Sequence, residues 1–326
     1  MVDISRETAW EMFKKLLLIR RVEEKIIYLF TQRQIRCPIH LSIGEEAIAV
    51  GICQALSAED MVFSNHRCHA HYLAKGGSLK RMFAELYGRQ TGCCQGMGGS
   101  MHLVDQSVNM MGSSSIVASS VPLAVGCAWR MKLKKRPVVT VSFFGDGAME
   151  EGVLYESMNF AALHKLPIIF VCEDNGLATY TPLSQRQPKA AISQRASAFM
   201  TCQSIKKGHD CGKIYQMIKT VIANNIFPAF LHIQTLRFTE HVGPKYETEA
   251  GVIDKELMKK AVEHYCPIKF WSKFLERHGM FRSSLETKNI LADIDRSISE
   301  AITFAQLSPF PSHNILKNIT WRLDNE

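Results

Sequence analysis

One stretch, residues 137–175, constrains the fold of this chain more than any other. Pro137–Phe144 is a β-branched apolar run of the kind found in buried parallel strands, and Gly145-Asp146-Gly147 ends it. Residues 150–164 then place apolar side chains on one helical face, and a second apolar strand over 166–171 leads to Glu173-Asp174-Asn175-Gly176. This order predicts a strand–helix–strand unit. We therefore expect an α/β fold with a parallel sheet flanked by helices.

Two oxygen ligands follow the strands of this unit. Asp146 ends the first strand, and Asn175 follows the second one, 29 residues later. The carboxyl ends of parallel strands meet at one edge of the sheet, where ligands of such folds bind. Carboxylate and amide oxygens suit Mg²⁺ or Ca²⁺ and do not suit zinc, and Mg²⁺ completes its shell with waters and phosphates. Because Gly145 and Gly147 allow a phosphate to approach the backbone, the pattern predicts a magnesium-bridged diphosphate.

This arrangement resembles the thiamine diphosphate motif, which begins with Gly-Asp-Gly and ends in a pair of Asn. Residues 151–167 also resemble the alpha subunits of pyruvate and acetoin dehydrogenases, and the similarity runs over about residues 10–245. Asp174 stands at the first Asn of the motif, whereas Asn175 keeps the metal-binding position. The resemblance implies the thiamin diphosphate-binding fold, with thiamine diphosphate and Mg²⁺ as cofactors. The residues that it assigns here are Asp146, Asn175 and Leu177 for the ion, and Gly145, Asp146, Gly147, Ala148 and Asn175 for the cofactor.

Two histidine-containing segments carry further family similarity. Residues 40–47, His-Leu-Ser-Ile-Gly-Glu-Glu-Ala, are similar to the family's His-Leu-x-x-Gly-Gln-Glu-Ala, which implies that His40 lines the active-site channel. His66 and Arg67 open a segment that resembles the acetoin-type His-Arg-Gly-His-Gly-His, which implies that both bind the diphosphate. A guanidinium fork is well suited to phosphate. The alternative for His40 is a helix-entry histidine bonded only to backbone.

Two later segments complete the implied site. Ser115 and Val117 occupy the places whose backbone groups hold the aminopyrimidine in the family, although the family has glycine where Ser115 stands. Arg237 and His241 lie in a stretch that resembles Arg-Tyr-x-Gly-His-Ser, so Arg237 would contact the diphosphate and His241 would lie near the reacting carbon. Residues 240–244 depart from the family pattern. The alternative for His241 is an ordinary histidine of a surface loop.

Other classes of site and partner are disfavoured. His66, His69 and His71 with Cys93-Cys94 make zinc conceivable, but the paired Cys-x-x-Cys spacing is missing. The ten cysteines are expected to be reduced, because a chain of 326 residues that is 46% hydrophobic needs no disulfides. The charge of +8 comes without basic runs interleaved with aromatics, so we expect no nucleic-acid partner. Without a signal-peptide core or a long apolar run, we expect a cytoplasmic protein with no membrane contact.

The remaining sequence predicts helices at both ends of one domain. We expect a single thiamine diphosphate-binding α/β domain over 1–326, with an N-terminal helical segment over 1–60 and a C-terminal helical segment over 250–326. Thr8-x-x-Glu11 is a capping-box pattern that predicts the start of a helix ending near Gln32.

The resemblance implies the first-component alpha subunit of a 2-oxo acid dehydrogenase. Such an enzyme decarboxylates a pyruvate-like acid and passes the acyl group to an acceptor such as the lipoyl arm of an acyltransferase component. His40 and His241 are the candidate catalytic residues for proton handling, because imidazole titrates near working pH. Two alternatives remain open at this point. One is non-oxidative acyl transfer or carboligation to an aldehyde, ketone or sugar, and the other is a non-catalytic Mg-nucleotide-binding module.

A second polypeptide is expected to complete the site. In the family, a glutamate on a second α/β domain activates the cofactor. After about residue 250 this chain has few β-branched apolar runs, so a second parallel sheet is not expected. We therefore predict a beta-type partner subunit and, by resemblance, an α₂β₂ assembly.

Overall fold

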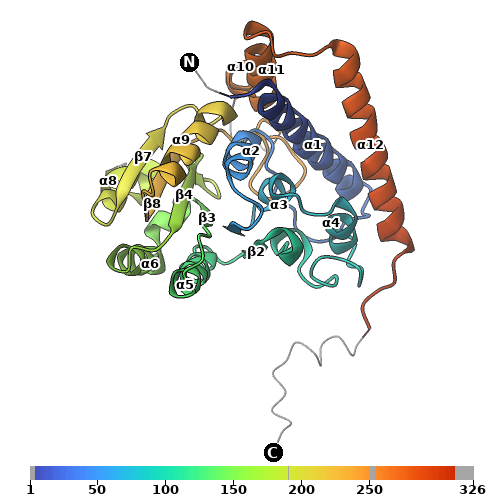
Figure 1. Ribbon diagram of the computed structural model, residues 1–326. Coiled ribbons are helices and arrows are strands. Elements are labelled where there is room, and N and C mark those ends of the chain that lie inside the picture. The colour runs from blue at the N-terminus through green and yellow to red at the C-terminus, as the bar shows by residue number, and fades with distance from the viewer. Residues whose placement is uncertain (1–3, 190, 250–253, 313–326) are drawn as a thin grey trace, which may run out of the picture.

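A computed structural model describes residues 4–189, 191–249 and 254–312 (Figure 1). Its centre is a six-stranded parallel sheet of order β2-β1-β3-β4-β8-β7. Its strands are β1 (Met61–Ser64), β2 (Met110–Ser113), β3 (Thr140–Gly145), β4 (Ile168–Asp174), β7 (Thr201–Ile205) and β8 (Ala229–Gln234). A short antiparallel pair, β5 (Leu177–Ala178) and β6 (Thr181–Pro182), follows β4. The expected parallel sheet flanked by helices is thereby confirmed.

Helices cover both faces of this sheet. They are α1 (Arg6–Thr31), α2 (Glu46–Ala55), α3 (His69–Lys75), α4 (Leu79–Leu86), α5 (Ser120–Leu133), α6 (Gly152–Leu163), α7 (Leu183–Arg186), α8 (Ile192–Ser197), α9 (Cys211–Ala223), α10 (Lys255–Tyr265), α11 (Pro267–Arg277) and α12 (Ser284–Leu307). A 3₁₀ turn, η3 (Asp146–Glu150), lies between β3 and α6, and two more, η1 (Gly99–Met101) and η2 (Gln106–Val108), precede β2. Over the described residues, none of these helices combines the length and apolarity needed to cross a membrane.

The alternation of side chains along the strands creates two cores. In β4, Ile169 and Val171 belong to the core shared with α1, α2 and α9, whereas Phe170 and Cys172 belong to the core shared with α5 and α6. Figure 1 shows these two groups of helices on opposite sides of the strands. Because both faces are covered, the central strands carry the continuous apolar runs that identified them in the sequence.

The start of α1 corrects one prediction. Thr8 does not cap this helix, because the cap is Ser5, whose Oγ accepts a hydrogen bond from the backbone N–H of Thr8 at 3.1 Å. Ser5 has the extended conformation of a cap residue, so the helix begins one turn earlier than the capping-box pattern suggests. The predicted end near Gln32 agrees with the last helical residue, Thr31. The C-terminal segment is helical in α10, α11 and α12, while 250–253 and 313–326 lie outside the described residues.

The order of the strands fixes where a ligand can bind. Strands β1 and β3 are neighbours, but the chain continues from β1 to the edge strand β2 and from β3 to β4 on the other side. Such a reversal opens a crevice at the carboxyl ends of the strands. The residues that follow β1, β3 and β4 are Asn65, Asp146 and Asn175, so all three arrive at this crevice.

Candidate active site

A cavity occupies this crevice and collects the residues singled out in the sequence. The predicted site residues that line it are His40, His66, Arg67, Ser115, Val117, Gly145, Asp146, Gly147, Ala148, Asn175, Leu177, Arg237 and His241. They come from segments spread over most of the chain. The structure thus brings every predicted site residue to one place, and the roles given to them stay predictions.

The predicted metal ligands form one corner of the cavity. Asp146 begins η3 and is 1% exposed, and Asn175 directly follows β4. The backbone N–H of Leu177 donates to Asn175 Oδ1 at 3.1 Å, and Asn175 Nδ2 donates to Glu45 Oε1 at 3.0 Å. These bonds fix the amide so that its oxygen faces the segment that carries Leu177.

Asp146 forms an ion pair with an arginine side chain, a contact that the sequence did not predict. Arg186, at the end of α7, donates through Nη2 to Asp146 Oδ2 and through Nη1 to Glu150 Oε2, the latter at 2.6 Å. Burial raises the pKa of the Asp146 carboxyl, the nearby Asp174 raises it further, and Arg186 opposes both effects. Arg186 therefore ties the segment after β6 to the turn after β3.

Glu45 lies inside the cavity, although its place before α2 suggested only a helix-start residue. It is 5% exposed, and its Oε2 lies 3.3 Å from Arg67 Nε without a hydrogen-bond geometry. Burial raises the pKa of the Glu45 carboxyl, while the Arg67 charge lowers it. The turn that presents Glu45 depends on Gly44, which has a φ of +99° and whose added Cβ would lie 2.4 Å from the Leu236 carbonyl oxygen.

Two arginines supply positive charge to the cavity wall. Arg67 donates to the Leu41 carbonyl and faces Glu45, and burial lowers the pKa of its guanidinium. Arg237 is 3% exposed and forms an ion pair of 2.6 Å with Glu247, which itself is fully buried. Both arginines line the cavity, as expected for residues that contact a diphosphate.

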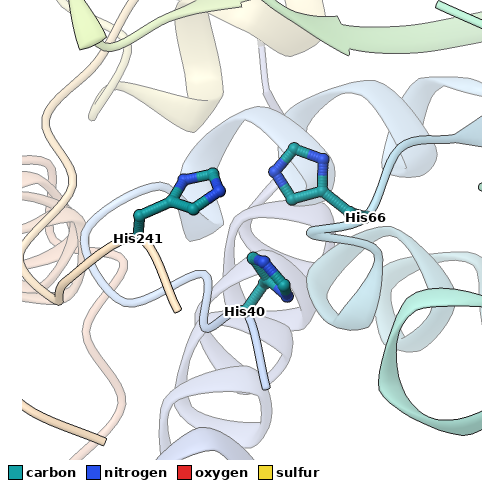
Figure 2. Close-up of side chains that lie close together, drawn as sticks. All are labelled: His40, His66 and His241. Atoms are coloured by element: carbon teal, nitrogen blue, oxygen red, sulfur yellow. The ribbon is translucent and has the colours of Figure 1, made fainter. Parts of the chain in front are cut away.

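Three histidines that line the cavity lie close together (Figure 2). The ring centroids of His40 and His66 are 4.8 Å apart, those of His40 and His241 are 5.1 Å apart, and those of His66 and His241 are 5.3 Å apart. Burial lowers the pKa of His40 to about 2, of His66 to about 3 and of His241 to about 4, with the neighbouring arginines adding to the effect. All three imidazoles are therefore neutral at pH 7 and can accept a hydrogen bond, but His40 and His241 do not titrate near working pH, in contrast to the expectation from the sequence.

The other two histidines of the His-rich segment have separate partners. His69 lies between Glu23, at 2.9 Å, and the Ser100 hydroxyl, at 2.8 Å. His71 lies between Ser64 and Glu173. Since both rings are engaged on their two nitrogens, the structure gives no support to a zinc site built from this segment and Cys93-Cys94.

The aspartate that departs from the thiamine motif has a partner of its own. Asp174 Oδ2 accepts from His232 Nε2 at 2.7 Å, and Asp174 Oδ1 accepts from the backbone N–H of Gly176 at 3.0 Å. The other nitrogen of His232, Nδ1, lies 3.0 Å from the Ser193 hydroxyl. This chain of contacts anchors the turn that carries Asn175 to β8 and α8.

The segment expected to hold the aminopyrimidine lies at the open rim. Ile116 and Val117 are 71% and 46% exposed, and Ser115 is also exposed. Ser115 does not have a positive φ, whereas Ala118, three residues later, does. Serine in place of the family's glycine therefore causes no backbone strain at position 115.

Several cavity residues were missed in the sequence. Asn65, Glu173 and Glu45 line the cavity, and Arg186 contacts Asp146 from outside it. A signal existed for Asn65, which precedes His66 after a strand end. Arg186 pairs across 40 residues and left no local pattern.

The donor set fits a magnesium-bridged diphosphate. Asp146 offers a buried carboxylate, and Asn175 and the Leu177 backbone add neutral oxygens, which is the ligand chemistry of Mg²⁺. Close packing holds this corner together, since a Cβ on Gly147 would lie 3.0 Å from the Ala178 Cβ. Arg67 and Arg237 line the same cavity, and their guanidinium groups would be the cations nearest to the phosphate oxygens.

Comparison with known proteins identifies the family. The family described as "Dehydrogenase E1 component" matches residues 14–314. The alpha subunit of acetoin:2,6-dichlorophenolindophenol oxidoreductase from Bacillus subtilis is 34% identical over 97% of this chain and 94% of its own length. The pyruvate dehydrogenase E1 component subunit alpha of Zymomonas mobilis is 33% identical over 94% of this chain and 86% of its own length. The chloroplastic pyruvate dehydrogenase E1 component subunit alpha-3 of Arabidopsis thaliana is 31% identical over 97% of this chain and 75% of its own length. The chain therefore belongs to the dehydrogenase E1 component family, as its resemblance to 2-oxo acid dehydrogenase alpha subunits predicted.

Proposed function

We propose that this chain is the alpha subunit of a thiamine diphosphate- and Mg²⁺-dependent enzyme that decarboxylates a 2-oxo acid. The acyl group would pass to an acceptor such as a lipoyl arm. The observation that carries the proposal is the cavity itself, in which the oxygen ligands of Asp146 and Asn175, two arginines and three neutral histidines share one crevice. The relatives are named as alpha subunits of acetoin:2,6-dichlorophenolindophenol oxidoreductase and of the pyruvate dehydrogenase E1 component. Both names describe oxidative enzymes, and the pyruvate dehydrogenase names support decarboxylation over carboligation or a non-catalytic nucleotide-binding module.

The binding roles follow from charge. Asp146, Asn175 and the Leu177 carbonyl would hold Mg²⁺, and Arg67, His66 and Arg237 would contact the diphosphate. Gly145, Gly147 and Ala148 line the same wall and leave room for a close approach of phosphate to the backbone. The bound cofactor would supply the electron sink for decarboxylation, while the protein orients it and excludes water.

The chemical roles fall to His40 and His241. Both are neutral at pH 7, so each can donate a hydrogen bond to the substrate carboxylate or carbonyl. Arg237 Nη1 lies 3.3 Å from His241 Nδ1, a contact that orients this ring toward the other two histidines. Their low pKa values keep both rings uncharged across the physiological range, so they serve as hydrogen-bonding groups and are weak bases in this cavity.

A beta-type subunit would complete this site, giving α₂β₂. The described part of the chain contains one six-stranded sheet, and the exposed rim residues Ile116 and Val117 lie beside the cavity mouth. No membrane or nucleic-acid partner is proposed. The cytoplasmic location and the single-domain organisation expected from the sequence stay predictions.

The test compares the chain alone with the chain plus its candidate beta partner. Pyruvate, thiamine diphosphate, Mg²⁺ and ferricyanide are supplied, and turnover is expected only with the partner. Within the active assembly, His241→Ala should lower kcat far more than cofactor affinity, whereas Arg67→Ala should mainly raise the Kd for the cofactor. His164→Ala, at the C-cap of α6 and not among the cavity-lining residues, is the matched control. Robust turnover by the chain alone would contradict the two-subunit proposal.

A further inference from the structure

The three histidines that line the cavity also have the geometry of a metal site. One ring nitrogen of each of His40, His66 and His241 lies within 4.8 Å of the other two. Figure 2 shows the three rings arranged around a common centre, with a nitrogen of each turned inward. Zinc held by imidazoles has Zn–N distances of about 2.0–2.1 Å, so small side-chain movements would bring all three nitrogens into one coordination shell.

The nitrogens of this cluster are largely free of competing partners. His40 is 7% exposed, and its Nδ1 is buried without a hydrogen-bond partner among the described residues. No hydrogen bond to a described residue is found for the His66 ring, and His241 has only the long contact with Arg237. None of the three is held by a carboxylate, in contrast to His69 and His71. A buried imidazole without a partner lowers the cost of binding a metal, because nothing has to be broken first.

The charge around the cluster tolerates a cation. Arg67 faces Glu45, and Arg237 is paired with Glu247. Glu173 adds a further carboxylate to the cavity wall. The two arginines nearest the histidines are therefore matched by acidic groups.

A second group of possible metal ligands among the described residues is less available to bind an ion. Glu85, Cys93 and Cys94 also have ligand atoms within 4.8 Å of one another. However, both oxygens of Glu85 already accept backbone N–H groups, from Cys94 and Gly96 on one oxygen and from Gly98 and Gly99 on the other. A metal bound by Glu85 would have to break these hydrogen bonds, so only the two cysteine thiols would remain as ligands at this place.

We propose that His40, His66 and His241 form a binding site for Zn²⁺ that is separate from the magnesium corner at Asp146. Three imidazole ligands leave the fourth tetrahedral position open. An ion at this place would occupy nitrogens of His40 and His241, which are given the chemical roles, and of His66, which is assigned to the diphosphate. Zinc is therefore expected to inhibit the enzyme without displacing Mg²⁺, which prefers the oxygen ligands of Asp146 and Asn175.

Binding is tested with the full chain and Zn²⁺ alone, by calorimetry, and with Co²⁺ as a spectroscopic probe of tetrahedral nitrogen coordination. His66→Gln and, separately, His241→Gln should each raise the Kd for Zn²⁺ more than about tenfold, since even changes outside the ligand shell cost about 10- to 100-fold. The double variant Cys93→Ser with Cys94→Ser is the control and should keep the wild-type Kd. Thermal unfolding checks that each variant is folded.

Two results would overturn the proposal. One is an unchanged Kd for Zn²⁺ in both histidine variants, and the other is loss of binding in the cysteine double variant. In the active assembly, micromolar Zn²⁺ should lower turnover, and a chelator that prefers zinc to magnesium should restore it. Because the Kd is measured without substrate or thiamine diphosphate, failure of the proposed dehydrogenase function would leave this measurement intact.

Discussion

Glu85→Gln should destabilise the protein strongly, because Glu85 organises the glycine-rich loop that leads to the cavity. Its Oε2 accepts the backbone N–H groups of Cys94 and Gly96 at 2.8 and 2.9 Å, and its Oε1 accepts those of Gly98 and Gly99 at 2.7 and 3.0 Å. Glu85 is 1% exposed. The single amide oxygen of glutamine can face only one of these pairs, which leaves two donors opposite an NH₂ group. At about 1–3 kcal/mol for each unsatisfied buried donor, the loss is about 2–6 kcal/mol.

The assay is denaturant unfolding of the wild-type chain, Glu85→Gln and the control Glu59→Gln. Glu59 pairs with Arg136 on the surface, where their side chains are 67% and 55% exposed, so its substitution should change the free energy of unfolding by under about 0.5 kcal/mol. Because η1 carries Met101 into the cavity wall, Glu85→Gln should also weaken cofactor binding. Equal unfolding midpoints for the two variants would refute the role given to the Glu85 carboxylate.

Two further perturbations test the electrostatics of the fold. Arg186→Gln removes the cation between Asp146 and Glu150, so the variant should unfold at a lower temperature than wild type when no metal is present. Mg²⁺ with thiamine diphosphate should raise the Tm of the variant more than the Tm of wild type. Equal Tm shifts in the two proteins would argue against this pairing. His209 is 6% exposed, and burial lowers its pKa to about 4. Because the unfolded chain takes up this proton near pH 6.5 and the folded protein does not, His209 alone should lower the free energy of unfolding by up to about 1.4 kcal/mol per pH unit between pH 6.5 and 4, in addition to the slope from His40, His66 and His241. His209→Phe should reduce the total slope, and an unchanged slope would contradict the assignment.

The sequence predicted the centre of the fold better than its edges. β3, α6 and β4 were visible because both faces of these strands are buried, which demands continuous apolar runs. β1 and β2 have only four residues each, and β7 is a partly exposed edge strand, so none of them has such a run. The first cap was misplaced because Ser5 and Thr8 are both good cap residues and only the packing of the helix start decides between them.

The site residues that follow a strand end within a motif could be predicted from the sequence. Those that are placed by contacts between segments far apart in the sequence could not. Asp146 and Asn175 were found from the strand–helix–strand pattern. Glu45 left no such local pattern, because its contacts with Asn175 and Arg67 join segments far apart in the sequence. The convergence of three histidines from separate segments likewise depends on the tertiary fold.

The most direct test of the central claim is the Mg²⁺-dependent affinity for thiamine diphosphate. Calorimetry on the assembled protein would compare wild type, Asp146→Ala and the surface control Asp293→Ala, each with Mg²⁺ and with EDTA. Since Asp146 is the only charged ligand assigned to the ion, its variant should bind the cofactor in Mg²⁺ no better than wild type does in EDTA. The control should behave as wild type. An unchanged Kd in Asp146→Ala would contradict the claim that this chain holds the diphosphate through a magnesium ion at Asp146.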